Sequence, residues 1–280
     1  MDDRQFKQLL DWFELSWAGY YRVRKGVKKR IRKHMQECAC RSVDDYLSKL
    51  AGDTKLREQC RVLLTVSISR FFRDQGLWQV LEKDILPALI TREHGEIGVW
   101  SAGCARGEEI YSFKILWDIL SERLDSVPKL QARATDMNPE YIKLAREGIY
   151  SASSLKGISN ELKGRYFRRI SKKQLFVVQD SVKFGILWDC LDLLKDNPPL
   201  ANFHMIFLRN NILTYYEKAP LQAALSNVTG SLLEGGYLII GSKERLPATA
   251  EQLHPHPGHS SIFVKWSAGE QAGSYPKSGP

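Results

Sequence analysis

The stretch Val99–Phe113 (VWSAGCARGEEIYSF) combines an apolar strand pattern, two glycines and two adjacent glutamates. Gly103 and Gly107 follow the apolar run and precede a helical pattern, so backbone there can approach a ligand closely. The spacing is not the dinucleotide-binding fingerprint. It is not a P-loop either, because no Gly-Lys-Ser/Thr follows and Glu108 and Glu109 would repel phosphate. The stretch therefore predicts a site for a ligand other than a polyphosphate.

An acidic residue, Asp136, ends the next strand pattern, LQARATD. A carboxylate at the end of a strand can accept hydrogen bonds from the two hydroxyls of a ribose. With Glu108 and Glu109 available to face a cation, the pattern suits a nucleoside with a positive centre, such as S-adenosylmethionine. The alternative is that the two glutamates only stabilise the N-terminal end of a helix.

The elements that must position these residues follow two different patterns. The first 85 residues read as helices: apolar residues recur at helical spacing from Phe6 to Trp17, Ser42 caps a helix that Gly52 closes, and another helix is expected over Lys55–Ile68. After Gly95, strand patterns alternate with helical ones, which predicts an α/β fold with a mostly parallel sheet covered on both faces. We expect domains at 1–85 and 86–266, and disorder in the Gly/Ser/Pro-rich tail 267–280.

Two segments of the α/β part carry more detailed predictions. The helix after Gly107 should bury the face formed by Ile110, Phe113, Trp117 and Leu120. The region 151–188 reads as one helix and a short strand pair, QLFVVQD and VKFGILW.

The composition is typical of a cytoplasmic protein. At 280 residues and 43% hydrophobic content, the chain can form one large α/β domain and a small helical partner. No apolar run could span a membrane, and the charged start, MDDRQFKQLL, does not resemble a secretory signal. Five scattered cysteines favour reduced thiols over disulfides. The prolines within HPHPGH (254–259) favour a solvated loop, so we expect no metal site.

The net charge of +9 is concentrated in one segment, RVRKGVKKRIRK at 22–33. Such a run either solvates a helix face or contacts an anionic partner. No aromatic residue lies within it, although Tyr20 and Tyr21 stand at its edge, so stacking on single-stranded nucleic acid is not specially indicated. An acidic protein and a nucleic-acid backbone remain open as partners, and membrane insertion is not expected.

Five motifs, in order along the chain, resemble the CheR-type protein-glutamate O-methyltransferases. They are SISRFFRD (67–74), VWSAGCARGEEIYS (99–112), ATDMNPEYIKLAREGIYS (134–151), FHMIFLRNNILTYY (203–216) and GGYLIIGSKERLP (235–247). The resemblance runs from Phe6 to Trp266. It implies an N-terminal helical domain joined to a class I, Rossmann-like methyltransferase fold that uses S-adenosylmethionine and releases S-adenosylhomocysteine. In this family the helical domain faces an acidic protein substrate, so the resemblance implies that the basic segment 22–33 contacts that substrate.

The resemblance also implies site residues. The family pattern Asn-x-Thr-x-Phe-Phe-Arg reads here as Ser67, Ser69 and Arg73, with the Asn amide lost and the Thr hydroxyl kept. Glu109 would face the methionine part of the cofactor and Asp136 its ribose. The full set of implied cofactor residues is Ser67, Ser69, Arg73, Gly103, Glu109, Asp136, Asp192, Leu193, Arg209 and Asn210, with Asp192 and Leu193 beside the adenine.

Two residues, Arg73 and Tyr215, are the predicted catalytic pair. A glutamate carboxylate titrates near pH ~4.3, so at neutral pH it needs no general base. Arg73 would orient the acceptor carboxylate through forked hydrogen bonds, and Tyr215 would shape the methyl pocket. Phe71 and Phe72 would form a core wall behind Arg73. The alternatives are that Arg209 is an ordinary surface cation and Tyr215 a packed aromatic.

The chain departs from the family pattern at several positions. Ile110 replaces a proline, Leu208 replaces a cysteine, and an extra residue before Tyr215 is more similar to the non-chemotaxis branch. In chemotaxis members with a receptor-tail docking site, a small added β-subdomain carries that site. Two other functions stay open: a methyltransferase of a small molecule or nucleic acid, and a non-catalytic cofactor-binding interaction module, which the changes at Ser67 and Ser69 would favour.

Overall fold

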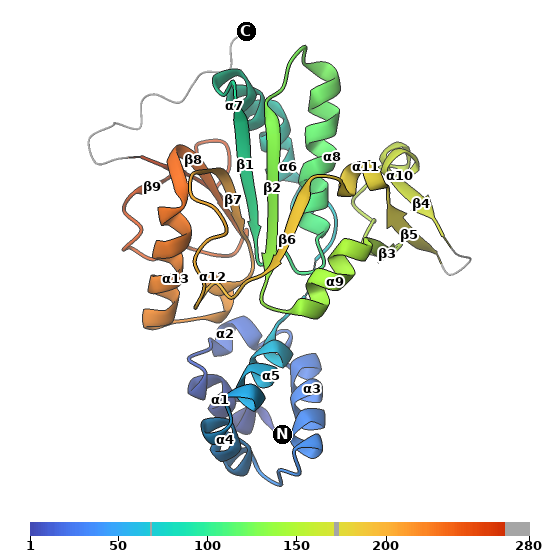
Figure 1. Ribbon diagram of the computed structural model, residues 1–280. Coiled ribbons are helices and arrows are strands. Elements are labelled where there is room, and N and C mark those ends of the chain that lie inside the picture. The colour runs from blue at the N-terminus through green and yellow to red at the C-terminus, as the bar shows by residue number, and fades with distance from the viewer. Residues whose placement is uncertain (68, 171–173, 267–280) are drawn as a thin grey trace.

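The structure, a computed structural model, describes residues 1–67, 69–170 and 174–266 (Figure 1). A helical domain lies below an α/β unit in the view of Figure 1, and a small β-subdomain projects from the side of that unit. The tail 267–280, for which disorder is expected, lies outside the described residues.

The helical domain contains α1 (Asp3–Trp12), α2 (Trp17–Tyr20), α3 (Arg24–Glu37), α4 (Val43–Gly52) and α5 (Thr54–Leu64). The Ser42 side chain accepts a hydrogen bond from the Asp45 N–H, which confirms the predicted cap of α4. The apolar side chains of these helices form one core that includes Phe6, Leu10 and Ile31. The helix expected over 55–68 ends earlier, at Leu64, because Thr65 turns to extended backbone.

The central sheet has the strand order β6-β2-β1-β7-β8-β10-β9. Its strands are β1 (Glu96–Ala102), β2 (Lys129–Asp136), β6 (Ile186–Cys190), β7 (Phe203–Leu208), β8 (Leu232–Ile240), β9 (Leu253–Pro255) and β10 (Ile262–Lys265). The first five strands in this order are parallel, β10 runs antiparallel to β8, and β9 antiparallel to β10. The predicted doubly wound α/β fold is confirmed. The strand order reverses between β1 and β7, the place where such sheets bind ligands.

Helices cover both faces of this sheet. On one face lie α6 (Gln75–Val80), the π-helix η1 (Leu81–Ile85), α7 (Leu86–Arg92) and α8 (Glu108–Arg123); on the other lie α12 (Ile212–Tyr215) and α13 (Lys218–Gly230). Val99 packs into the first layer and its neighbour Trp100 into the second, as alternation along a strand requires. All four residues of the predicted α8 face are buried. Because 75–92 packs on the sheet, the expected boundary at 85 falls inside one helical segment, and the division stays a prediction.

The β-subdomain is a three-stranded antiparallel sheet in the order β3-β5-β4. It consists of β3 (Ile149–Ser151), α10 (Asn160–Tyr166), β4 (Phe167–Arg169), β5 (Leu175–Val178) and α11 (Asp180–Lys183), and β3 follows α9 (Pro139–Glu147) directly. The expected pair of QLFVVQD with VKFGILW is wrong: the first forms β5, while the second leads into β6 of the central sheet. A local apolar pattern identifies a strand but not its partner.

The sequence also led to expectations about the cysteines, membrane-spanning helices and metal ligands. All five cysteines are free thiols. Within the part of the chain that the structure describes, no helix is long and apolar enough to cross a membrane. No group of three or more potential metal ligands occurs among the same residues.

A substitution of Phe71 tests the packing that anchors the segment before α6. Its ring is fully buried and meets the rings of Tyr150 and Phe167 edge-on, each with centroids 4.9 Å away. Phe71→Ala should lower the free energy of unfolding by about 3–5 kcal/mol, measured in urea, because it leaves a cavity. The matched control is Phe184→Ala, since Phe184 is 82% exposed and should change stability by less than about 0.5 kcal/mol. Equal effects of the two changes would contradict this packing.

Candidate active site

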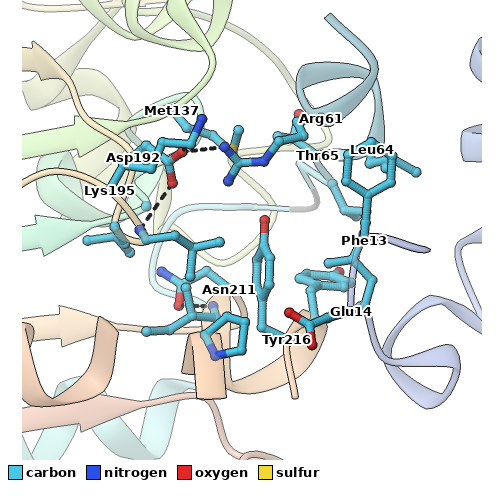
Figure 2. Close-up of a pocket in the computed structure, with 18 of the residues that line it drawn as sticks. Phe13, Glu14, Arg61, Leu64, Thr65, Met137, Asp192, Lys195, Asn211 and Tyr216 are labelled. Atoms are coloured by element: carbon cyan, nitrogen blue, oxygen red, sulfur yellow. Dashed lines mark hydrogen bonds and ion pairs between the residues drawn. The ribbon is translucent and has the colours of Figure 1, made fainter. Parts of the chain in front are cut away.

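A cavity of about 650 Å³ lies where the carboxyl ends of the central strands face the helical domain (Figure 2). Its size is within the range of ligand pockets. The α/β unit contributes lining residues that include Gly103, Asp136, Met137, Asp192 and Asn210. The helical domain closes the opposite side with residues that include Phe13, Tyr20, Arg57, Arg61 and Leu64. The cavity is therefore formed by both domains.

The loop between β1 and α8 needs its two glycines because other side chains of the protein lie too close for a larger residue there. Gly103 and Gly107 have φ of +80° and +87°. A methyl group on Gly103 would lie 2.4 Å from the Asn211 side chain, and one on Gly107 would lie 2.9 Å from the Trp188 ring. Gly103 also lines the cavity, so the loop passes close to any occupant.

Asp136 ends β2 with its carboxylate fixed by the backbone. It accepts one hydrogen bond from the Ala105 N–H and one from the Asn138 N–H, each 2.9 Å long. The residue is 8% exposed, and this burial raises the pKa of its carboxyl to about 6. Asp136 also lines the cavity, and its two carboxylate oxygens can each accept further hydrogen bonds.

An ion pair crosses from the helical domain to the loop after β6. Arg61 of α5, whose side chain is 9% exposed, donates to Asp192 at 2.6 Å, and Lys195 contacts Glu58 of α5 at 2.6 Å. Figure 2 shows Arg61 reaching toward Asp192 above the Tyr216 ring. Asp192 thus carries a cross-domain contact as well as lining the cavity. Sequence reasoning missed Arg61, because nothing local indicates a partner so distant in the chain.

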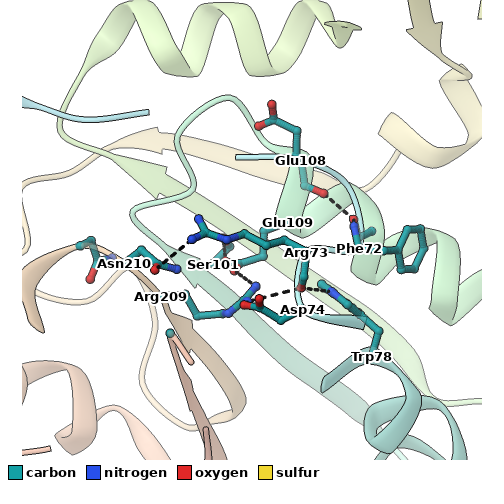
Figure 3. Close-up of polar contacts among 12 residues, drawn as sticks. Phe72, Arg73, Asp74, Trp78, Ser101, Glu108, Glu109, Arg209 and Asn210 are labelled. Carbon is teal, nitrogen blue, oxygen red and sulfur yellow. Dashed lines mark hydrogen bonds and ion pairs between the residues drawn. The ribbon is translucent and has the colours of Figure 1, made fainter. Parts of the chain in front are cut away.

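A cluster of paired charges lies beside the cavity (Figure 3). The Arg209 side chain is 4% exposed and pairs with Asp74 and, at 3.1 Å, with Glu109. Glu109 also accepts a hydrogen bond from the Ser101 hydroxyl at 2.8 Å. The reading of Arg209 as a surface cation is wrong, since a buried guanidinium needs partners. Arg73 in turn donates to the Asn210 side-chain oxygen at 3.4 Å.

The predicted site residues divide into two groups. Six line the cavity: Gly103, Asp136, Asp192, Leu193, Asn210 and Tyr215. Five are not in its lining: Ser67, Ser69, Arg73, Glu109 and Arg209. Glu108 is buried at the start of α8; burial raises the pKa of its carboxyl, while its own backbone N–H and the Ser69 hydroxyl act to lower it. Glu108 therefore fits the helix-end alternative, whereas Glu109 belongs to the charge cluster.

Tyr215 lies on the single turn α12, which packs against the helical domain. The Ser16 N–H donates to the Tyr215 carbonyl at 2.9 Å, and the Tyr20 and Tyr215 ring centroids are 4.9 Å apart. A methyl group on Gly19 would lie 2.2 Å from the Thr214 carbonyl oxygen, so α2 and α12 touch through backbone. Burial raises the pKa of the Tyr215 phenol to about 12. Tyr215 is thus both a packed aromatic and a cavity residue.

A family model for the "CheR methyltransferase, SAM binding domain" matches residues 67–262. The chain belongs to the CheR methyltransferase family. It is 28% identical over 239 residues to the "Probable chemotaxis protein methyltransferase" of Rhizobium etli, covering 83% of this chain and 88% of that protein. It is 29% identical over 220 residues to the chemotaxis protein methyltransferase of Listeria innocua, covering 79% and 81%. It is 28% identical over 240 residues to chemotaxis protein methyltransferase 1 of Pseudomonas aeruginosa, covering 83% and 87%.

Membership confirms the function that the motifs implied. The protein is a protein methyltransferase that uses S-adenosylmethionine, and the CheR family methylates glutamate. The cavity fits this cofactor. Asp136 offers acceptors for ribose hydroxyls, and Met137, Tyr141 and Leu193 offer apolar walls for an adenine. The nearby Arg61 and Arg209 are paired with carboxylates, so neither is set to bind a phosphate.

Asp136 should make cofactor binding depend on pH. Burial raises its pKa to about 6, and donation from ribose hydroxyls to the carboxylate would lower it again, so binding would favour the ionised form. The affinity for S-adenosylhomocysteine should therefore fall as the pH drops through about 6, measured by calorimetry. Asp136→Asn should bind more weakly and without this dependence. Asp189→Asn, at a half-exposed aspartate, should keep the original profile. An affinity of the unmodified protein that stays constant through pH 6 would contradict this role.

Proposed function

We propose that the protein transfers the methyl group of S-adenosylmethionine to the side-chain carboxylate of a glutamate in another protein, inside the cavity between its two domains. The observation that carries the proposal is the cavity itself. In a chain of the CheR family, it brings Asp136 and Asn210 of the α/β unit to the same space as Tyr215. The helical domain covers this space, which would exclude water from the reacting groups.

The proposed chemistry needs positioning and no proton transfer. When bound, S-adenosylmethionine supplies a methyl group on a positively charged sulfur. The acceptor glutamate, with an ordinary pKa of about 4.3, is already ionised at neutral pH. Transfer would join an oxygen of that glutamate to the methyl carbon and break the carbon–sulfur bond, giving a methyl ester and S-adenosylhomocysteine. Holding the groups in line can lower the barrier by roughly 7–11 kcal/mol.

The residues beside the cavity would do this positioning. Arg73, held by the Asn210 side chain, would orient the acceptor carboxylate through its forked donors. Tyr215 would line the methyl pocket. The high pKa of its phenol keeps it protonated, so it offers a hydroxyl and not a base.

The proposed cofactor contacts come mainly from residues that line the cavity. Asp136 would hold the ribose, Asp192 and Leu193 would flank the adenine, and Gly103 and Asn210 would complete the lining. Arg209 would act indirectly, since it fixes Glu109, the residue expected to face the methionine part. Ser67 and Ser69 stay predictions as residues of the cofactor site.

The proposed substrate is an acidic protein surface that meets α3. Of the basic residues on or before this helix, Arg24 and Lys28 pair with Asp3, whereas Lys25, Lys29 and Arg32 are exposed. An exposed run of one sign favours a partner of the opposite sign and speeds its association. We propose the cytoplasm as the compartment.

Arg73→Ala tests the proposed reaction. The protein and its host lysate would be incubated with S-adenosylmethionine labelled on the methyl group, and the protein fraction treated with mild alkali. Carboxyl methyl esters release volatile methanol under these conditions. The unmodified protein should produce alkali-released label, and Arg73→Ala should reduce its rate on the order of 100-fold, because the acceptor is no longer oriented.

The matched control is Arg70→Ala, because Arg70 is exposed in the same segment and should not alter the rate. Label that resists alkali would favour another acceptor over glutamate. Binding of S-adenosylhomocysteine without any transfer would favour the non-catalytic module. Equal rates for the two alanine variants would refute the role of Arg73.

Charge reversal on α3 tests the substrate surface. Lys25→Glu, Lys29→Glu and Arg32→Glu together should slow protein labelling in the lysate about 10-fold or more, because electrostatic steering is lost. Calorimetry with S-adenosylhomocysteine should give unchanged affinity. The charge-matched control reverses the exposed Lys7, Lys83 and Lys143 instead. Equal slowing by both triple variants would show that only net charge matters.

A further inference from the structure

A carboxylate outside the predicted site, Glu244, lies behind the turn that carries Tyr215. It follows β8 and is partly buried, and this burial raises the pKa of its carboxyl. Its oxygens accept three hydrogen bonds: from the Thr214 hydroxyl, from the Asn210 N–H at 2.8 Å and from the Gly241 N–H at 2.6 Å. One side chain therefore joins the end of β8 to the end of β7 and to α12.

Glu244 joins two short segments, Asn210 and α12, whose backbone conformations depend on contacts with the rest of the protein. Asn210 has a φ of +55°, a left-handed conformation that costs energy for a residue with a side chain. The α12 helix has four residues, far fewer than an isolated helix needs for stability. Both segments carry predicted site residues, so their geometry must be imposed from outside.

The space around Glu244 is closely filled. A methyl group on Gly241 would lie 2.7 Å from a Glu244 oxygen and 2.9 Å from the Asn210 side-chain oxygen. That same Asn210 oxygen accepts the hydrogen bond from Arg73 (Figure 3). A displacement of Glu244 would thus pass to Arg73 through Asn210, and to Tyr215 through Thr214.

We propose that Glu244 is a positioning residue for methyl transfer, which holds the Tyr215 turn through Thr214 and the Arg73 contact through Asn210. This inference rests on the proposed function, because it assigns Glu244 to the same reaction. Glu244 does not line the cavity, so it acts through its neighbours and not on the substrate.

Thr214 gives a test that leaves Glu244 in place. Thr214→Val removes the hydroxyl but keeps the shape of the side chain, whereas Thr214→Ser keeps the hydroxyl. With labelled S-adenosylmethionine and the lysate acceptor fraction, Thr214→Val should lower kcat roughly 10- to 100-fold. Thr214→Ser should restore most of it. The affinity of both variants for S-adenosylhomocysteine should stay within about twofold of the original, since the Asn210 contact is untouched.

Two further variants separate positioning from stability. Thr229 is buried elsewhere, and its hydroxyl donates to the Ser226 carbonyl; Thr229→Val should lower the melting temperature and leave kcat unchanged. In a Glu244→Ala background, adding Thr214→Val should cost nothing more, because the two residues act as a unit. If Glu244→Ala does not fold, the comparison of Thr214→Val with Thr214→Ser still tests the role of Glu244.

The outcomes are distinct. No transfer by the unmodified protein would overturn the proposed function itself. Transfer by the unmodified protein, with Thr214→Val as active as Thr214→Ser, would overturn the role of Glu244 alone. An equal loss of kcat in Thr229→Val would also overturn it, because the effect would then be one of general stability.

Discussion

A single helical turn cannot by itself fix the position of a side chain, and the candidate active site of this protein includes such a turn. α12 has four residues, so the turn depends on contacts from other elements. The Asn211 side chain ties it to the Ala102 carbonyl at the end of β1, Thr214 ties it to Glu244 after β8, and the Tyr215 carbonyl accepts the Ser16 N–H. Three separate parts of the chain thus determine where Tyr215 lies.

The third of these contacts makes the helical domain part of the candidate active site. Only a glycine at position 19 allows α2 to approach the Thr214 carbonyl, and Arg61 adds an ion pair to Asp192 on the other side of the cavity. A domain that served only to recruit substrate would not need backbone contacts of this kind. The same domain carries α3, so the proposed substrate surface and the wall of the cavity are held by one packed core.

Charge is distributed unevenly around the cavity. Arg209 and Arg61 are nearly buried and bonded to carboxylates, as a low-dielectric setting requires. Among the residues that the structure describes, the hydrogen bonds of the Asp136 carboxylate come from backbone N–H groups, and burial raises the pKa of its carboxyl. A ligand with hydroxyl donors would satisfy it, which agrees with the nucleoside cofactor of the CheR family.

Local sequence rules predicted the elements, and contacts distant in sequence decided the rest. The Ser42 cap and the buried face of α8 depend on residues within one or two turns, so the sequence alone was sufficient. Asp136 could be recognised because the end of a parallel strand next to the switch point is a known ligand position. The partner of β6 could not be predicted, because its pattern suits either sheet. Arg61 gave no signal, and Glu244 stood in the fifth family motif without an implied role, since the roles of both come from residues that only the fold brings near.

The central claim is that the cofactor binds in a cavity formed by both domains, and backbone hydrogen exchange tests it most directly. Exchange would be measured with and without saturating S-adenosylhomocysteine. The account predicts slower exchange in three places: the loops after β1 and β2, α12, and α5 of the helical domain, whose Arg61 and Leu64 line the cavity. Slowing confined to the loops of the α/β unit, with α5 unchanged, would contradict it.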